Sequence, residues 1–532
     1  MANLKMANNY DYLIVGSGFG GSVSAYRLAQ KGYSVLVVEQ GKRYEADDFP
    51  KTNWNLRKWF WVPALRFYGF SRIKLFRHIT VMAGAGVGGG SLVYANTLPV
   101  PRKEFYDLGS WAGLNDWKTE LAPFYEIASK MLGTSQNPHL GPGDEALEEL
   151  SKEIGKHDLF EPTQVGVFFG EPEVTVPDPY FNGEGPEREG CRFCGGCMVG
   201  CRYNAKNTLD KNYLYLAEKL GAEILPSHKV VDVQQLTDDS DGKSHTYRVA
   251  LHPVGKPFKS KKYIKVKGVV FSGGVLGTVP LLLKLKRKSL PELSDQVGRG
   301  VRSNNEALIG VVSRKRKIDF TDGVAIGSIV HTDLHSHLEP VRYPSGSGFW
   351  RLLMAPMLSG KNFFHRLALL IWDYIRHPVT NAKAYFVGNW AKKVQILLFM
   401  QTLDSRLQIS KGFFGTRTKM EDGPAPSAFI PEAQELAKKY ARIINGKPLV
   451  LPTESLLGIP TTAHILGGAC MGKDQEHGVI DKHHRVFNYE NMYVIDGSAV
   501  SANPGVNPSL TITALAERAM SIIPAKNLQN KK

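Results

Sequence analysis

The chain has 532 residues, enough for two domains, and its hydrophobic fraction of 43% and charged fraction of 22% are ordinary for a globular protein. The formal net charge is +16, but the basic residues are spread along the chain and form no nucleic-acid-binding motif, so nucleic acid is not an expected partner. No stretch approaches the roughly 18 uninterrupted apolar residues of a spanning helix, and no signal-like segment precedes the first predicted strand. We therefore expect a cytoplasmic protein, with peripheral membrane contact left open.

The chain begins with the pattern of a dinucleotide-binding unit. Residues 10–15 are an apolar run that suits a buried strand, residues 22–31 have apolar side chains at helical spacing, and residues 33–38 form a second apolar run. Glu39 follows this second strand, 18 residues beyond Gly21, where its carboxylate can accept hydrogen bonds from ribose hydroxyls. The order of these elements predicts a Rossmann-type fold.

Three glycines join the first strand to the helix in a G-x-G-x-x-G motif: Gly16, Gly18 and Gly21. The first makes the tight turn, the second lets the backbone approach a pyrophosphate, and the third lets the helix pack on the strand. The start of the helix offers unpaired N–H groups and a partial positive charge to phosphates. This motif alone does not choose between FAD and NAD.

A second glycine-rich segment, residues 84–91, favours FAD. Its five glycines indicate backbone that passes very close to a large planar or phosphate-bearing group. The segment resembles one in the glucose–methanol–choline (GMC) oxidoreductase family, whose members use FAD and in which it runs along the flavin. The resemblance implies FAD contacts from this segment and the residues just after it: Gly84, Gly88, Gly89, Ser91 and Asn96.

The C-terminal part resembles the same family. Residues 491–498 are similar to its last strand, whose aspartate approaches the flavin phosphates or ribitol, which implies that Asp496 and Gly497 contact FAD. Residues 503–508 precede a helix predicted over 510–522, and the start of that helix can stabilise negative charge at the flavin N1–O2 edge.

His464 and Asn507 are similar to the paired catalytic positions of the family, where a His is joined by a His or an Asn. An alcohol can give hydride to the flavin only as its O–H proton is removed or strongly bonded. A His can accept that proton or hold the alkoxide-like oxygen, and an Asn amide can donate to the same oxygen. We predict that this pair forms the reaction centre.

The choice of Asn over His at the second position resembles the cholesterol-oxidase branch of the family, as do residues 207–209 and 301–304. In that branch a Glu of the substrate domain acts as a base and can also move a ring double bond. The best local match is Glu339, and a solvated surface glutamate is the alternative interpretation. The resemblance therefore implies a sterol or steroid substrate, with 5-ene to 4-ene isomerisation left open.

The cysteines form one cluster in sequence. Cys191, Cys194, Cys197 and Cys201 have the C-x2-C-x2-C-x3-C spacing of ferredoxin cluster ligands, although Arg202 stands where a proline is usual. An iron–sulfur cluster, a zinc site and four structural thiols are all compatible with this spacing. A cluster could carry electrons from the flavin to an acceptor other than oxygen, which would make the enzyme a dehydrogenase.

Two stretches rich in aromatic and basic residues suggest contact with a membrane surface. Residues 54–78 contain no acid, and residues 349–393 contain only Asp373. Aromatic and basic side chains without acids suit an interface with anionic lipid headgroups, with Trp59, Phe60 and Trp61 as expected contacts. The alternative is core helices with snorkelling Arg and Lys.

The expected fold is an α/β structure with a Rossmann-type FAD-binding domain and a substrate-binding domain built on a mixed or antiparallel sheet with helices. The expected activity is FAD-dependent oxidation of a sterol or steroid 3-hydroxyl; oxidation of another apolar or long-chain alcohol, with oxygen or a different electron acceptor, and a non-catalytic flavoprotein are the alternatives. The predicted FAD-binding domain comprises residues 1–50, 78–105, 187–300 and 462–532, and the predicted substrate-binding domain comprises 51–77, 106–186 and 301–461.

Overall fold

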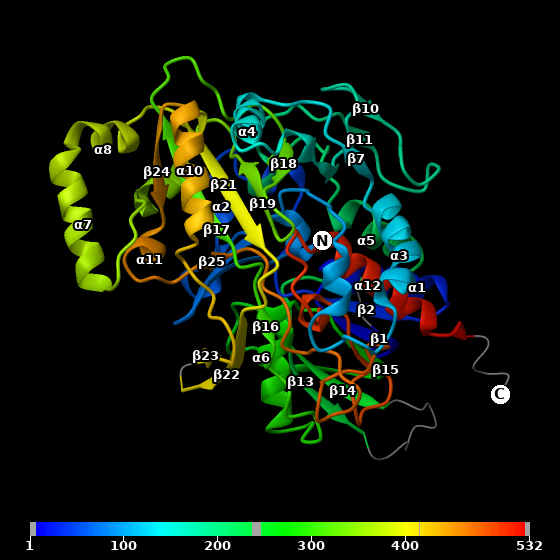
Figure 1. Ribbon diagram of the computed structural model, residues 1–532. Coiled ribbons are helices and arrows are strands. Elements are labelled where there is room, and N and C mark those ends of the chain that lie inside the picture. The colour runs from blue at the N-terminus through cyan, green and yellow to red at the C-terminus, as the bar shows by residue number, and fades with distance from the viewer. Residues whose placement is uncertain (1–6, 237–245, 414, 527–532) are drawn as a thin grey trace.

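The computed structural model describes residues 7–236, 246–413 and 415–526, and these residues fold around two seven-stranded sheets (Figure 1). The first sheet holds the dinucleotide-binding motif, and the second lies in the upper part of Figure 1. This arrangement confirms the predicted fold class.

The first sheet is parallel around its centre and antiparallel at one side. β1 pairs in parallel with β2 and with β15, and β26 pairs in parallel with β15, while β13, β14 and β15 form an antiparallel meander. In spatial order its strands are β12 (Glu223–Leu225), β2 (Val35–Val38), β1 (Asn9–Val15), β15 (Lys262–Phe271), β14 (Tyr247–Pro253) and β13 (His228–Gln235), with β26 (Met492–Val494) beside β15.

Helix α1 begins at Phe19, three residues before the predicted start. The reason is that Gly20 and Gly21 lack side chains, so the first turn packs directly on backbone, where a Cβ would lie 1.8 Å from the oxygen of Ile495 and 2.1 Å from that of Gly16. The helices that pack around this sheet are α1 (Phe19–Gln30), α3 (Trp117–Met131), α5 (Tyr213–Lys219), α6 (Val275–Lys286) and α12 (Ser509–Ile522).

Helix α3 packs on α12, and its buried Trp117, Leu121 and Tyr125 belong to the hydrophobic core of the first sheet. The predicted boundaries place this helix in the substrate-binding domain. In the structure the apolar face of α3 is buried against α12, which is far away in sequence.

The second sheet is antiparallel throughout. Its face away from the first sheet is covered by α4 and α10, whose side chains form a core with β17, β18 and β19 (Figure 1). In spatial order the strands are β20 (Ala355–Pro356), β24 (Gly446–Val450), β17 (Ala307–Ser313), β21 (Val394–Gln401), β19 (Ser336–Val341), β18 (Ser328–His331) and β8 (Phe160–Pro162); the helices are α4 (Pro142–Glu153) and α10 (Pro431–Ile443).

Smaller elements connect the two sheets. Three-stranded sheets are β25–β6–β5 (Thr461–Thr462, Thr80–Gly84, Ser71–Leu75) and β16–β22–β23 (Val301–Arg302, Arg406–Gly412, Gly415–Met420); two-stranded sheets are β3–β4 (Trp61–Val62, Phe67–Tyr68), β7–β9 (Thr134–Gln136, Gln164–Gly166) and β10–β11 (Thr175–Val176, Arg188–Glu189). The remaining α-helices are α2 (Leu56–Trp59), α7 (Phe363–Arg376), α8 (Pro378–Tyr385), α9 (Trp390–Lys393) and α11 (Pro452–Ser455). Short 3₁₀ helices are η1 (Ala46–Asp48), η2 (Pro63–Leu65), η3 (Gly89–Leu92), η4 (Lys103–Asp107), η5 (His157–Leu159), η6 (Cys197–Val199), η7 (Leu209–Lys211), η8 (Phe349–Leu353) and η9 (Gly497–Ala499).

Candidate active site

A cavity of about 380 Å³ lies between the two sheets. One end is lined by the glycine motif after β1, the end of β2 and the segment after β15, which is where parallel sheets of this kind bind nucleotides. The other end is lined by apolar side chains of the second sheet and nearby loops. These include Leu308, Ile326, Val341, Trp350, Ile396 and Leu398.

The two glycine-rich segments meet at the nucleotide end of the cavity. Gly16 has a φ of +100° and Gly89 a φ of +52°, both in the region that favours glycine. A Cβ on Gly89 would lie 2.6 Å from Gly18 Cα, so the two segments touch through bare backbone. Gly16, Gly18, Gly84 and Gly89 all line the cavity. Such a cradle leaves room for a bulky phosphate-bearing group.

Two predicted carboxylates, Glu39 and Asp496, line the same end. Glu39 accepts hydrogen bonds from the backbone N–H groups of Ser17 and Gly41, and Asp496 accepts from Gly274 N–H and the Thr278 hydroxyl. Burial raises the pKa of both carboxyls, although these hydrogen bonds oppose it. The protein thus holds both side chains rigidly at the cavity wall, and Gly497 lies beside Asp496.

Four other predicted cofactor residues lie behind this wall. Gly21 packs against Gly16, and Ser91 donates a hydrogen bond to the carbonyl of Gly88 and accepts one from Leu209 N–H. These residues shape the glycine segments. Asn96 is fully buried with a φ of +72°, and both polar atoms of its amide are buried without a hydrogen-bond partner.

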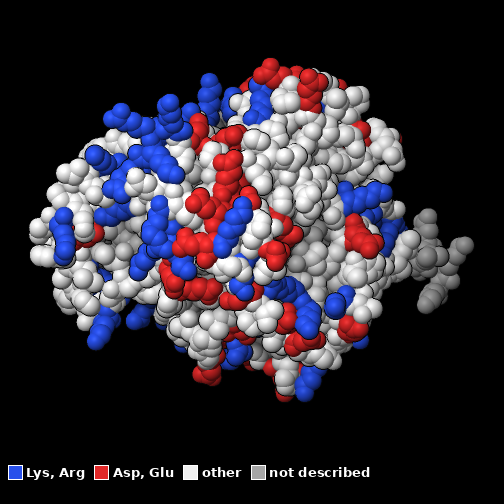
Figure 2. All heavy atoms as spheres, turned by 45° about the horizontal axis from the view of Figure 1, so that its top comes forward, with Lys and Arg blue, Asp and Glu red and all other residues white. Residues whose placement is uncertain are grey.

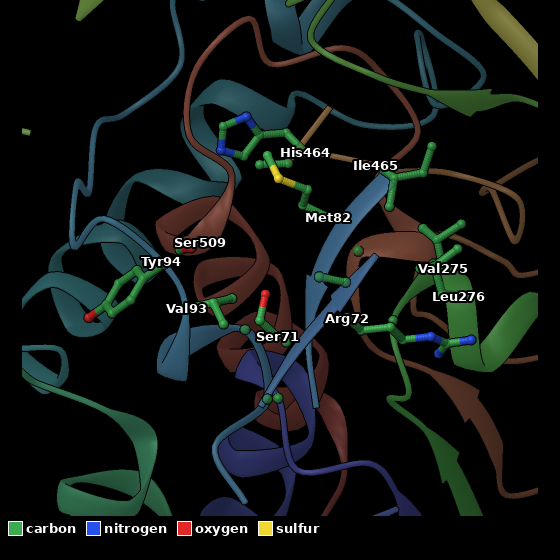
Figure 3. A pocket seen from close by; sticks show the side chains of 18 of the residues that line it. Ser71, Arg72, Met82, Val93, Tyr94, Val275, Leu276, His464, Ile465 and Ser509 are labelled. Carbon is green, nitrogen blue, oxygen red and sulfur yellow. The ribbon is translucent and has the colours of Figure 1, made fainter. Parts of the chain in front are cut away.

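These residues fit an FAD molecule. The N-terminus of α1 opens into the cavity at the glycine motif, and the start of α12, with Pro508 and Ser509, lines it as well (Figure 3). Each helix start presents unpaired N–H groups and a partial positive charge, which suit phosphates and an electron-rich ring edge.

His464 reaches into the cavity beside Met82 (Figure 3). Its Nδ1 lies 3.1 Å from Oε1 of Glu306, a residue that the sequence analysis did not identify. Glu306 is fully buried and accepts hydrogen bonds from the Thr462 hydroxyl and from the backbone N–H groups of Ala463 and His464. Because Nδ1 faces Glu306 at ion-pair distance, Nε2 of His464 is the ring nitrogen left for a substrate.

The contact between His464 and Glu306 also changes their charge states. Burial by itself lowers the pKa of the imidazole, but the attraction of Glu306 outweighs burial, so the pKa of His464 is raised. Burial raises the pKa of Glu306, but His464 and the hydrogen bonds outweigh it, and the net direction is down. The pair therefore favours imidazolium and carboxylate.

Asn507 lines the same cavity as His464, and its Oδ1 is buried without a hydrogen-bond partner. Glu339 lies on β19, directly opposite Leu398 and two residues before Val341, and both of these side chains line the cavity. The alternation of a strand thus points Glu339 towards the cavity face. Its side chain is fully buried, and neither carboxylate oxygen has a hydrogen-bond partner, although His337 Nε2 lies 3.5 Å from Oε1. The charge of Glu339 contributes to the raised pKa of His464. The alternative interpretation of Glu339 as a solvated surface glutamate is therefore wrong.

The comparisons with known proteins agree with this geometry. The sequence pattern "GMC oxidoreductase" matches residues 437–516, and the pattern "NAD(P)-binding Rossmann-like domain" matches residues 14–44. A cholesterol oxidase from Acinetobacter baumannii is 46% identical over 98% of the chain and 95% of the relative, and one from Mycobacterium tuberculosis is 43% identical over 98% and 92%. The chain belongs to the GMC oxidoreductase family. It falls in the cholesterol-oxidase-like branch and is an FAD-dependent alcohol oxidoreductase.

More distant proteins share the fold. A long-chain-alcohol oxidase from Arabidopsis thaliana is 25% identical over 98% of the chain and 68% of the relative. The solved structure of a pyridoxine 4-oxidase from Mesorbium loti has a TM-score of 0.62 at 15% identity, covering 96% of this chain and 98% of that one. The first comparison does not favour a long-chain alcohol as substrate, and the second supports the GMC fold alone.

The cysteine cluster of this GMC protein does not support the predicted iron–sulfur or zinc site. All four cysteines are free thiols, and Cys191, Cys197 and Cys201 pack in one small apolar cluster. In the part of the chain that the structure describes, no group of three or more His, Cys, Asp or Glu side chains is arranged to hold a metal ion. Burial raises the pKa of the Cys191 thiol, which keeps it protonated at neutral pH.

The two aromatic stretches differ in exposure. In residues 54–78, Trp59 is 1% exposed and packs on Trp350, so its predicted contact with lipid is wrong. Phe60 and Trp61 are partly buried. Residues 349–393, by contrast, contain helix α7, which has no buried residue. None of the helices within residues 7–236, 246–413 and 415–526 is long and apolar enough to span a membrane.

Proposed function

We propose that this enzyme oxidises the 3-hydroxyl group of a sterol or steroid. The observation that carries the proposal is one cavity that is lined by the glycine cradle, by an apolar wall and by His464 and Asn507. Such a wall suits a large apolar ring system with one polar group. The names of the relatives, cholesterol oxidases at 43–46% identity, support the same substrate class.

The three site residues have distinct roles in this proposal. FAD, when bound, supplies the acceptor for the hydride that leaves the alcohol carbon. His464, biased towards imidazolium by Glu306, donates a hydrogen bond from Nε2 to the alcohol oxygen, and Asn507 donates a second from its amide. Glu339, buried and unpaired near His464, accepts the hydroxyl proton.

Glu339 also supports an isomerisation step. An unpaired carboxylate on the cavity face can take a proton from one ring carbon and return it to another, which moves a 5-ene double bond to the 4-ene position. In this proposal Glu339→Gln slows oxidation, because Glu339 accepts the hydroxyl proton, and also abolishes conversion of a supplied 5-en-3-one to the conjugated enone. His464→Ala lowers oxidation by on the order of a hundredfold.

The decisive experiment is anaerobic bleaching of the bound flavin. We expect cholesterol to bleach it rapidly and a long-chain alcohol slowly, and readmitted air to restore the colour, because oxygen is the acceptor that the oxidase relatives suggest. The His464→Ala variant, with FAD retained, is the control. Faster bleaching by the long-chain alcohol would replace the sterol with that substrate, and no bleaching by either would refute the proposal.

We also propose that α7 and α8 contact the membrane from which the substrate comes. Phe364, Ile371, Trp372 and Ile375 lie at helical spacing on α7 and are all exposed, and Phe386 just after α8 is 87% exposed. Figure 1 places both helices at the left edge, and Lys and Arg gather at the upper left of Figure 2.

The charges around this apolar stripe suit anionic lipid. The stretch contains a single acid, Asp373, whose carboxylate is already paired with Lys447 at 2.7 Å. Exposed cations include Lys361, Arg376 and Lys383. Trp350 and Met354 line the cavity while Leu352 between them is exposed, so the cavity wall and this surface share one short segment. A bilayer docked here would deliver a sterol close to the cavity.

Vesicle co-sedimentation tests this contact. We expect binding to vesicles with anionic lipid that weakens as salt rises, because exposed charges are screened within about 8 Å at physiological ionic strength. The double variant Trp372→Ser, Ile375→Ser should bind less with FAD retained. Phe258→Ser, at a fully exposed site on another loop, is the matched control and should bind like the parent. Equal binding by both variants would contradict the proposal.

A further inference from the structure

A row of ionisable side chains crosses the second sheet on its cavity face. On β19, Leu338 points into the core under α4 and α10, so His337 and Glu339 point to the opposite face. On the neighbouring strand β18, His331 is paired directly with His337. Glu161 on β8 is paired with Ile329, which shares the face of His331. The register of three strands therefore aligns these groups.

The row leads from the active site to solvent. His337 Nε2 lies 3.5 Å from Glu339 Oε1, the rings of His337 and His331 are 5.8 Å apart between centroids, and His331 Nε2 lies 4.0 Å from Glu161 Oε1. Side-chain exposure rises along the row, from 0% for Glu339 and 3% for His337 to 21% for His331 and 64% for Glu161. One ring rotation or one water molecule can bridge the spacing between the two imidazoles.

The buried end of the row has polar atoms that folding alone does not explain. Both oxygens of Glu339 and Nε2 of His337 are buried without a hydrogen-bond partner. Leaving such groups unpaired costs free energy, and apolar residues would cost less at these positions. Unpaired buried groups that face a reaction centre indicate a functional role.

We propose that His337 and His331 carry protons between Glu339 and solvent. The inference rests on the proposed alcohol oxidation, in which the alcohol carbon gives up a hydride to FAD and its hydroxyl gives up a proton. That proton passes to Glu339, then to His337, then to His331, and leaves to water at the exposed end. Each step breaks one O–H or N–H bond and forms another, so Glu339 returns to its carboxylate form before the next substrate binds.

The charges around the row suit rapid transfer. Burial, His337 and Arg102 together lower the pKa of His331 to about 4, so this imidazole is neutral at neutral pH. A neutral imidazole has one donor and one acceptor nitrogen and can pass a proton on without retaining it. His464 faces Glu339 from the cavity side, and Glu161 faces His331 from β8.

The test compares His337→Gln with His335→Gln in the FAD-loaded full-length enzyme. His335 is an exposed histidine on the turn between the same two strands and serves as the control. We expect steady-state oxidation of cholesterol in air at pH 7 to slow by about tenfold in His337→Gln and to stay unchanged in the control, because Glu339 must lose its proton before each new turnover. Added imidazole should restore the rate of His337→Ala, an effect that a purely structural role of His337 would not produce.

Histidine NMR titration of the same protein without substrate gives a second measurement. The His331 signal, assigned by its loss in His331→Gln, should titrate at higher pH in His337→Gln, because His337 is one of the groups that lower the pKa of His331. If no alcohol bleaches the flavin of the parent protein, the proposed function is refuted. The titration still tests whether His337 and His331 interact as the proton path requires. An unchanged titration of His331, or equal turnover rates without rescue by imidazole, would overturn the proton path.

Discussion

Glu306 controls the protonation of His464 in the active site. Its carboxylate is buried, receives three hydrogen bonds and lies 3.1 Å from the imidazole. Glu454 lies near Glu306, but burial raises its pKa to about 8, so it is uncharged at neutral pH and does not cancel this effect. Glu306 is thus the main negative charge that acts on His464.

Glu306→Gln should move the pH dependence of oxidation downwards. Because Glu306 raises the pKa of His464, its removal lowers that pKa. In the proposed mechanism activity requires imidazolium and is lost as pH rises through this pKa, so the alkaline limb should shift to lower pH. The measurement is kcat/KM for cholesterol between pH 5 and pH 10, roughly the range in which histidine and its neighbours titrate.

A control variant separates this effect from general damage. Glu421→Gln changes a half-buried carboxylate that accepts from Gly300 N–H and is not among the cavity-lining residues, so it should leave the profile unchanged. If the alkaline limb of the kcat/KM profile does not move in Glu306→Gln, another group sets the pH dependence. If kcat/KM falls equally at every pH, the substitution has only misplaced His464.

Family motifs led to His464 and Asn507, which both line the cavity, but not to Glu306. Both predicted residues lie in segments that resemble family motifs, whereas Glu306 precedes His464 by 158 positions. Only the packing of the start of β17 beside the loop after β25 brings them together. Glu339 was found by a short motif, but its burial depends on strand register, which the sequence did not reveal.

At the scale of elements, the two glycine-rich segments act as one cradle. Gly89 at the start of η3 touches Gly18 just before α1, and Gly86 lies within reach of Gly41 after β2. The positions of the strand, helix and second strand could be predicted because each motif is local. The strand order of the second sheet and the exposure of α7 could not, because they depend on contacts between distant segments.

Gly89→Ala should weaken FAD binding. A methyl group at this position would lie 2.6 Å from Gly18 Cα, and the backbone φ of +52° is unfavourable for alanine, so one glycine segment has to move away from the other. We expect purified protein with a lower ratio of flavin to protein absorbance. Gly388→Ala is the matched control, since its Cβ meets no atom within 4 Å and its φ is not positive. Full flavin content in Gly89→Ala would show that the cradle tolerates displacement.

At the scale of the whole molecule, a hydrophobic cluster joins the two halves. Tyr44, Phe49 and Leu92 come from segments around the nucleotide motif, while Val312 and Ile396 come from the second sheet, and all five are buried in one cluster. The cavity lies against the same cluster, with Ile396 in its wall. FAD bound in this cavity would therefore lie next to the hydrophobic cluster that already joins the two halves.

Removal of FAD should lower the stability of both halves together. A ligand present at 100 times its Kd stabilises the folded state by about 2.7 kcal/mol when it does not bind the unfolded chain. Because the shared cluster couples the halves, we expect one calorimetric transition whose Tm rises as FAD is added back to the stripped protein. The Gly89→Ala variant should need more FAD for the same rise. Two separate transitions, of which only one responds to FAD, would show that the cluster does not couple the two halves.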